Sequence, residues 1–89
     1  MATIWKYPIP LQDEFTIQMP DGAQILYVQA QNNMAYMWAR VLTEQSVVDR
    51  NFRLRGTGHF IDLDCIHIGS FMLYGGDFVF HLFEVLPGG

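Results

Sequence analysis

Two groups of side chains have the types and spacing needed to bind a ligand, and the first is aromatic. If Asn32-Asn33 forms a two-residue hairpin turn, paired residue numbers sum to 65 and Tyr27 lies opposite Trp38. The face that these two residues share is expected to hold Ile25, Tyr27, Gln29, Tyr36, Trp38 and Arg40. Aromatic rings stack on bases, and Trp, Tyr and Arg dominate protein-binding hot spots. The face therefore predicts contact with a ligand or a target protein, with a subunit contact or ordinary cross-strand packing as alternatives.

The second group ends a short basic strand, in the segment Arg53-Leu54-Arg55-Gly56-Thr57-Gly58-His59. Strand alternation places Arg53 and Arg55 on one face, and the turn after them leaves backbone N–H groups free. Two guanidinium groups beside such a turn suit a phosphate or a carboxylate. Thr57 and His59 are expected to complete this candidate ligand site. The alternative is a solvated face on which the arginines pair with nearby acids: Asp49, Asp62 or Asp64.

Histidine and cysteine are too sparse to predict a catalytic or metal site. Cys65 and His67 are expected on one strand face, whereas His81 on the neighbouring strand is expected to face the other way. Zinc requires three or four convergent ligands, and this arrangement offers two. A structural pair between His67 and Glu84 is the favoured role. No Ser-His-Asp or paired-carboxylate arrangement stands out either, so we expect a protein that is not an enzyme and uses no metal or cofactor.

Short strands are expected to position these groups, because turn dipeptides recur between runs of alternating apolar residues. Asp21-Gly22, Asn32-Asn33 and Gly75-Gly76 each accept the positive φ of a two-residue hairpin turn. At Gly75-Gly76 the paired residue numbers would sum to 151. The expected strands cover residues 4–7, 14–19, 24–31, 34–42, 50–55, 66–74 and 77–86. We therefore predict one all-β domain over residues 1–89, a small antiparallel sandwich or partly closed barrel of about seven hairpin-connected strands.

The composition narrows the partners of this domain. Hydrophobic residues make up 51% of the 89 residues, and a domain this small cannot readily bury so much apolar surface. This composition predicts a homo-oligomer. The net charge of −4 argues against duplex nucleic acid as a partner, because binding it requires a basic field. The chain has one cysteine, no signal-peptide pattern and no apolar run near the roughly 20 residues that cross a bilayer. These features predict a cytoplasmic protein without membrane contact.

Four stretches of the chain together resemble a family of small, uncharacterised β-rich proteins of phages, prophages and bacteria. They are Ile4-Trp5-Lys6-Tyr7-Pro8, the run from Phe15 to Ala23, Gly56-Thr57-Gly58-His59 and His81-Leu82-Phe83-Glu84. The resemblance implies a genomic setting and no known activity or site residues. In that setting we expect a phage accessory protein, located in the host cytoplasm, that counters bacterial defence by stoichiometric binding.

The partner of such a protein stays open between three classes. The leading hypothesis is a nucleotide-derived immune signal, with Tyr27, Tyr36 or Trp38 stacking on the base. In this hypothesis Arg53, Arg55 and the turn after them would hold the phosphate. The first alternative is a protein–protein inhibitor of a host defence enzyme, and the second is a structural or virion-associated module.

Overall fold

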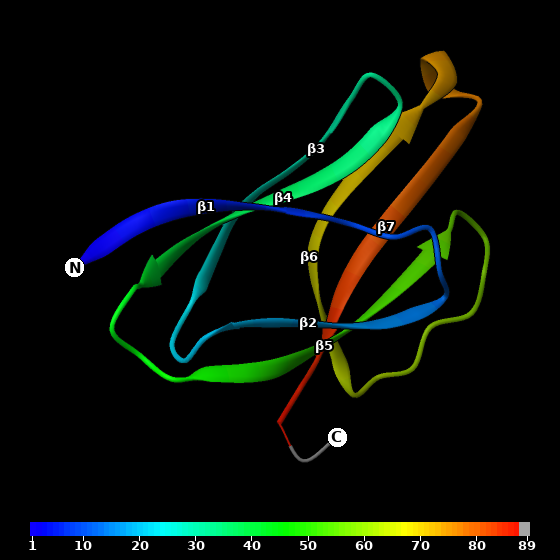
Figure 1. Cartoon of the computed structure of the whole chain (residues 1–89). Coiled ribbons are helices and arrows are strands. Elements are labelled where there is room, and N and C mark those ends of the chain that lie inside the picture. The colour runs from blue at the N-terminus through cyan, green and yellow to red at the C-terminus, as the bar shows by residue number, and fades with distance from the viewer. Residues whose placement is uncertain (88–89) are drawn as a thin grey trace.

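The computed structural model describes residues 1–87, which form two antiparallel β-sheets packed on one another (Figure 1). The first sheet has three strands in the order β1-β4-β3, and the second has four in the order β2-β5-β7-β6. The elements are β1 (Ala2–Pro8), β2 (Glu14–Pro20), β3 (Gln24–Gln31), β4 (Met34–Leu42), β5 (Val47–Gly56), β6 (Cys65–Leu73), the 3₁₀ turn η1 (Tyr74–Gly76) and β7 (Phe78–Val85). The predicted all-β class and strand number are confirmed, as a sandwich rather than a closed barrel.

The connections between strands depart from the predicted series of hairpins. Consecutive strands pair at β3–β4 and β6–β7, whereas β1 pairs with β4, β2 with β5 and β5 with β7. The turn at Asp21-Gly22 does form, with Gly22 at a φ of 80° and the Ala23 N–H donating to the Pro20 carbonyl at 3.1 Å. It carries the chain from the second sheet to the first, so the hairpin predicted there is wrong. Turn chemistry reverses the chain but does not decide which sheet the next strand joins.

The Asn32-Asn33 hairpin is confirmed in its turn geometry. Both asparagines have a positive φ, 52° and 60°, as a type I′ turn requires. Pairing follows the predicted register from the turn as far as Tyr27. A β-bulge then inserts Leu26, so that Ile25 lies opposite Ala39 and Leu26 is half exposed. The predicted place of Ile25 on the face of Tyr27 and Trp38 is therefore wrong, because the bulge turns Ile25 toward the core.

The β6–β7 hairpin also contains a bulge, and this one rearranges polar side chains. The turn η1 replaces the predicted two-residue loop, yet the predicted register holds from the turn as far as Gly69. A bulge between His67 and Gly69 then shifts the pairing by one residue, and His67 lies opposite Phe83. The predicted pairing of His67 with Glu84 is therefore wrong.

The core lies between the two sheets and draws on both. Its most completely buried large side chains are Met37 and Val41 of β4 together with Met19, Phe52, Leu73 and Leu82 of the other sheet. Burying a side chain of this size contributes roughly 1.5–3 kcal/mol. Along one side of the sandwich β3 and β6 run next to each other, with Val28 against Gly69, and we call this line of contact the seam (Figure 1). β1 and β2 are the remaining edge strands of the two sheets.

Candidate functional site

The aromatic face lies on the outer surface of the three-stranded sheet. Tyr27 on β3 is directly opposite Trp38 on β4, with ring centroids 5.8 Å apart. Tyr36 continues the row, 6.3 Å from Trp38. The Tyr27 hydroxyl donates a hydrogen bond to the side-chain oxygen of Gln29. The hairpin register predicted these neighbours correctly.

Lys6 on β1 also belongs to this face, and sequence reasoning missed it because the pairing of β1 with β4 has no local signal. The Lys6 Nζ lies 4.0 Å from the ring centroid of Tyr36 and 5.5 Å from that of Trp38. It also donates to the Gln31 side-chain oxygen at 2.7 Å. This cation–π contact covers Tyr36, whereas Tyr27 is 56% exposed. Tyr27 is therefore the ring best placed to stack on a ligand.

The aromatic face carries positive charge that no carboxylate neutralises within the described residues. Arg40 donates from Nη2 to the side-chain oxygen of Gln24 at 2.6 Å, and Lys6 likewise bonds a neutral amide. The ion pairs of residues 1–87 involve neither of these two cations. The face therefore favours ligands or partners that carry negative charge.

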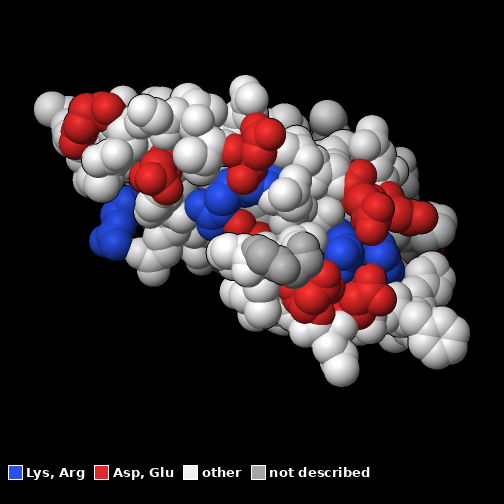
Figure 2. All heavy atoms as spheres, turned by 90° about the horizontal axis from the view of Figure 1, so that it is seen from below, with Lys and Arg blue, Asp and Glu red and all other residues white. Residues whose placement is uncertain are grey.

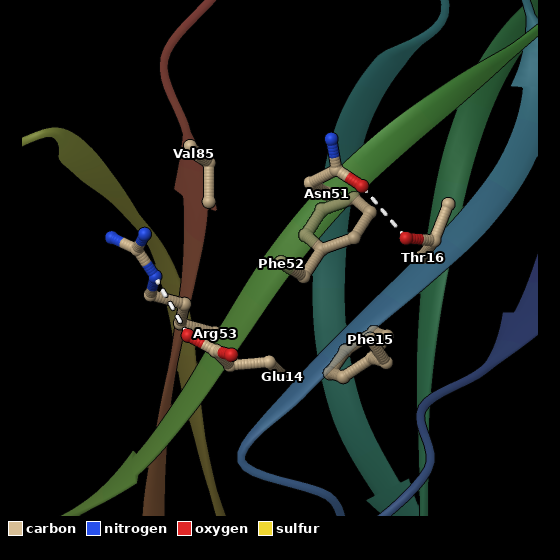
Figure 3. Close-up of a pocket in the computed structure, with 7 residues that line it drawn as sticks. All are labelled: Glu14, Phe15, Thr16, Asn51, Phe52, Arg53 and Val85. Carbon is tan, nitrogen blue, oxygen red and sulfur yellow. Dashed lines mark hydrogen bonds and ion pairs between the residues drawn. The ribbon is translucent and has the colours of Figure 1, made fainter. Parts of the chain in front are cut away.

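Arg53 lies on the outer surface of the four-stranded sheet and is engaged by carboxylates. It forms a hydrogen-bonded ion pair with Asp64 and further ion pairs with Glu14 at 3.4 Å and Asp62 at 3.5 Å. The Arg53 hydrogen bond holds the pKa of Asp64 below its usual range. In Figure 3 the Glu14 carboxylate lies against the Arg53 guanidinium at the rim of a shallow depression. Of the two sequence interpretations, the charge-paired one describes Arg53.

Arg55 anchors main-chain groups. Its guanidinium donates to the carbonyl oxygens of Asp13 at 2.7 Å and Phe60 at 3.2 Å. The two arginines thereby hold the loop of residues 57–64, whose Phe60 and Leu63 side chains are 97% and 98% exposed. On the molecular face in Figure 2, most blue patches are bordered by red ones, so this face offers no extended basic surface.

The eight predicted ligand residues do not form one site in a single chain. Tyr27, Tyr36, Trp38 and Arg40 lie on the outer face of the three-stranded sheet. Arg53, Arg55 and Thr57 lie at the outer face of the four-stranded sheet, and His59 packs against Gly56. Because the two sheets share one core, their outer faces look in opposite directions. The rings and the arginines therefore cannot hold the base and the phosphate of the same small ligand in one chain.

A hydrogen-bonded network that the sequence did not predict crosses the four-stranded sheet. The bulge after His67 turns this side chain to the face of His81, so the prediction that the two face opposite ways is wrong. The Ser70 Oγ lies 2.7 Å from Nδ1 of His81 and 3.0 Å from Nε2 of His67. The Thr57 Oγ1 lies 2.8 Å from Nε2 of His81. Gly69 was the available signal, because a glycine inside a strand often marks a bulge.

A groove along the seam brings the aromatic face next to this network. Tyr27 and Gln29 of β3 line one wall and Ser70 of β6 lines the other. The groove has a volume of about 460 Å³, which falls in the range of roughly 300–1,000 Å³ typical of small-molecule sites. The two strands approach closely because Gly69 has no side chain to press on Val28. We call this the seam groove.

One family model matches nearly the whole chain. A domain of unknown function, DUF7352, matches residues 1–88. The chain belongs to this family. The prediction of an uncharacterised family is thereby confirmed. No curated protein and no solved structure matches the chain.

Three other features of this DUF7352 protein bear on what it can bind. Within residues 1–87, no group of three or more His, Cys, Asp or Glu side chains is arranged to hold a metal ion. The same residues contain no helix long and apolar enough to cross a membrane. The free thiol of Cys65 donates to the Asp62 carbonyl at 3.1 Å. The seam groove is lined mainly by apolar groups, among them Val28, Met72 and Val79. Beside these it offers a ligand the ring of Tyr27, the amide of Gln29 and the hydroxyl of Ser70, which is held by two imidazoles.

Proposed function

We propose that this protein works by stoichiometric binding and that the seam groove holds a planar, negatively charged small molecule. One observation carries the proposal: the exposed ring of Tyr27 and the hydroxyl of Ser70 line the same groove from opposite walls. The ring stacks on the ligand, which contributes roughly 1–3 kcal/mol. The amide of Gln29 and the Ser70 hydroxyl orient its polar edge. A nucleotide-derived molecule combines the flat base and the anionic group that such a site selects.

One choice of histidine tautomers leaves the Ser70 hydroxyl free to donate to a ligand. A serine hydroxyl has one proton and two acceptor lone pairs. When His67 donates from Nε2 and His81 from Nδ1, both lone pairs of the Ser70 Oγ are used and its proton is left for a ligand acceptor. In the same arrangement Thr57 donates to Nε2 of His81, so both ring nitrogens of His81 are hydrogen-bonded. The network thus acts as a fixed donor and requires no catalytic step.

The positive field for an anionic ligand comes from the aromatic face. Lys6 and Arg40 bond neutral amides, whereas Arg53 is held by three carboxylates. Ser70, with the field of Lys6 and Arg40, therefore takes over the phosphate-binding role that the sequence suggested for Arg53 and Arg55. This assignment keeps the ring and the donor on the two walls of one groove.

The resemblance to phage and prophage proteins supplies the biological setting of the proposal. The protein is a phage accessory protein in the host cytoplasm, where it sequesters a nucleotide-derived immune signal. Sequestration needs one site per chain and no turnover. An abundant small binding protein lowers the free signal by mass action alone.

Inhibition of a host defence protein by direct contact is the second candidate function. The observation that favours it is the loop tip, where Phe60 and Leu63 are almost fully exposed although Arg53 and Arg55 hold the loop in place. Exposed apolar patches on soluble proteins mark partner sites.

Titration calorimetry with cyclic nucleotides and cyclic ADP-ribose isomers tests the small-molecule proposal. We expect one member of the panel to bind with one molecule per chain. Tyr27→Ala should weaken binding by about tenfold to a hundredfold, because it removes the stacking ring. Ser70→Ala should weaken it by about tenfold, through the lost hydrogen bond. Thr16→Val is the matched control. It removes a hydroxyl that bonds Asn51 on β2, the other edge strand of the four-stranded sheet to which Ser70 belongs.

The outcomes separate the candidates. An absence of heat across the panel refutes the small-molecule version. Binding that survives both Tyr27→Ala and Ser70→Ala means that the ligand sits outside the seam groove. A host protein captured by the wild type and released by Phe60→Ser, but retained by Tyr27→Ala, supports the inhibitor. Recovery of the protein in purified particles supports the virion-associated module.

A further inference from the structure

The free edge of β1 is a second binding surface, independent of the seam groove. We propose that β1 pairs antiparallel with β1 of a second copy and joins two three-stranded sheets into one of six strands. β1 lies at the end of its sheet and, within the described residues, has β4 as its ladder partner. An unpaired edge strand presents N–H and C=O groups to any strand that can match them. This pairing would give the predicted homo-oligomer a defined interface.

The free backbone groups on this edge belong to even-numbered residues. The Thr43 N–H donates to the Met1 carbonyl at 3.0 Å, and the Ile9 N–H donates to the Ala35 carbonyl at 2.9 Å. In an antiparallel ladder, residues that bond to one neighbouring strand alternate with residues that bond to the opposite side. Odd-numbered residues of β1 therefore bond to β4, and even-numbered ones point outward. The outward N–H groups are those of Ala2, Ile4 and Lys6.

One register lets this edge satisfy itself. When Ile4 lies opposite Ile4 of the second copy, Ala2 of each chain pairs with Lys6 of the other. Every outward N–H group then finds a carbonyl oxygen across the interface. Pro8, which has no N–H to donate, falls beyond the last pair. A two-fold axis through Ile4 produces this arrangement from identical chains, so the edge is self-complementary.

The side chains of β1 also favour this edge. Ile4 is 59% exposed on the outer face, and Trp5 is 42% exposed on the inner face. In the proposed register Ile4 packs on its own copy across the axis, and Trp5 packs beside Thr3 of the second copy. The free edge of β2, by contrast, carries polar outer side chains: Glu14, Thr16 and Gln18. Because burial of apolar surface drives association, β1 is the edge that a second copy covers.

Substitution at the two-fold axis tests the proposal. Ile4→Lys places two like charges opposite each other, and so does Ile4→Glu, so each variant alone should dimerise at least about tenfold more weakly than the wild type. An equimolar mixture of the two should recover the dimer, because a lysine then faces a glutamate. Gln18→Lys and Gln18→Glu on the β2 edge are the matched controls and should dimerise as the wild type does. Sedimentation velocity over a concentration series, with native mass spectrometry, counts the subunits.

Three results would overturn the proposal. One is a wild type that sediments as a single 10.3 kDa chain at every concentration. Another is a dimer that both Ile4 variants leave intact. The third is a dimer that the Gln18 variants disrupt instead, which would assign the interface to β2.

Amide hydrogen exchange of the wild type gives a second test that requires no variant to fold. In separate chains the N–H groups of Ile4 and Lys6 should exchange quickly, whereas those of Trp5 and Tyr7 are protected by β4. Raising the concentration should slow exchange at Ile4 and Lys6 and leave Gln18 on β2 unchanged. Fast exchange at Ile4 and Lys6 in a protein that is already dimeric would refute this interface.

Discussion

Adding one methyl group at Gly69 tests whether the seam holds the two sheets in contact. An ideal Cβ at this position lies 3.0 Å from both the Cβ and the Cγ2 of Val28 on β3. Carbon atoms in contact are normally about 3.5–4.0 Å apart, so Gly69→Ala must push β6 away from β3. The Cβ of Val28 is fixed to its backbone, and no side-chain rotation relieves that clash.

The size of the effect follows from two opposing contributions. Overpacking a tightly packed site costs about 1–3 kcal/mol. Replacing glycine by alanine stabilises the folded state by about 0.4–1 kcal/mol, because the unfolded chain has less conformational freedom. The free energy of unfolding should therefore fall by about 1–2 kcal/mol, which lowers the Tm of a domain of this size by about 5–15 °C. The displaced strands also widen the seam groove, so ligand binding should weaken in the same variant.

Urea unfolding followed by the fluorescence of Trp5 and Trp38 measures this loss. Gly56→Ala is the matched control, because its added Cβ also meets a close neighbour, His59 Cε1 at 3.2 Å. That neighbour is the end of an exposed side chain that can move, so the free energy of unfolding should change by less than about 0.5 kcal/mol. If Gly69→Ala proves no more costly than Gly56→Ala, the close approach of β3 and β6 at the seam is refuted.

Three further substitutions test the ion pairs and a buried hydroxyl. Arg50 donates to the Glu84 Oε1 at 2.9 Å in a largely buried site. Arg50→Met should leave the Glu84 carboxylate without its partner and lower the free energy of unfolding by on the order of 2–3 kcal/mol. Equal thermal stability would contradict this. Arg53 lowers the pKa of Asp64 in the folded protein. The ion pair between them therefore stabilises the fold fully above the unfolded-state pKa of about 3.9, and this stabilisation is lost as the pH falls through the lower folded-state pKa. Arg53→Gln should therefore flatten the acid limb of a plot of urea midpoint against pH, and an unchanged limb would count against the pair. The Tyr7 hydroxyl is buried without a hydrogen-bond partner in the described residues, and burial raises its pKa. Tyr7→Phe should therefore leave the free energy of unfolding unchanged or raise it by up to about 1 kcal/mol. The same variant should lose less stability than the wild type as the pH rises above about 10, which chemical unfolding at alkaline pH measures.

The strands and the hairpin turns could be predicted because their signals are local. Asn32-Asn33 accepts positive φ at both positions, and this alone fixes the type I′ turn and the pairing next to it. The alternation from Phe15 to Met19 likewise matches β2. The aromatic face was predictable for the same reason, since Tyr27 and Trp38 are paired through that turn.

The bulges and the sheet order could not be predicted with the same means. Leu26 lies in an unbroken apolar run, so the pattern does not show which residue is the extra one. Gly69 signals a bulge but does not say that Val28 of the other sheet lies against it. The pairing of β1 with β4, which places Lys6 on the aromatic face, joins segments that are distant in the sequence.

The seam groove is tested most directly by native mass spectrometry of the protein purified from the cells that produce it. We expect the wild type to retain one small molecule per chain, and the released molecule to absorb ultraviolet light as a nucleobase does. Ser70→Ala and Tyr27→Ala should each retain less of that molecule than the wild type, whereas Thr16→Val should retain as much. A wild type that carries no small molecule would refute binding in the seam groove, and so would a molecule that both groove variants retain in full.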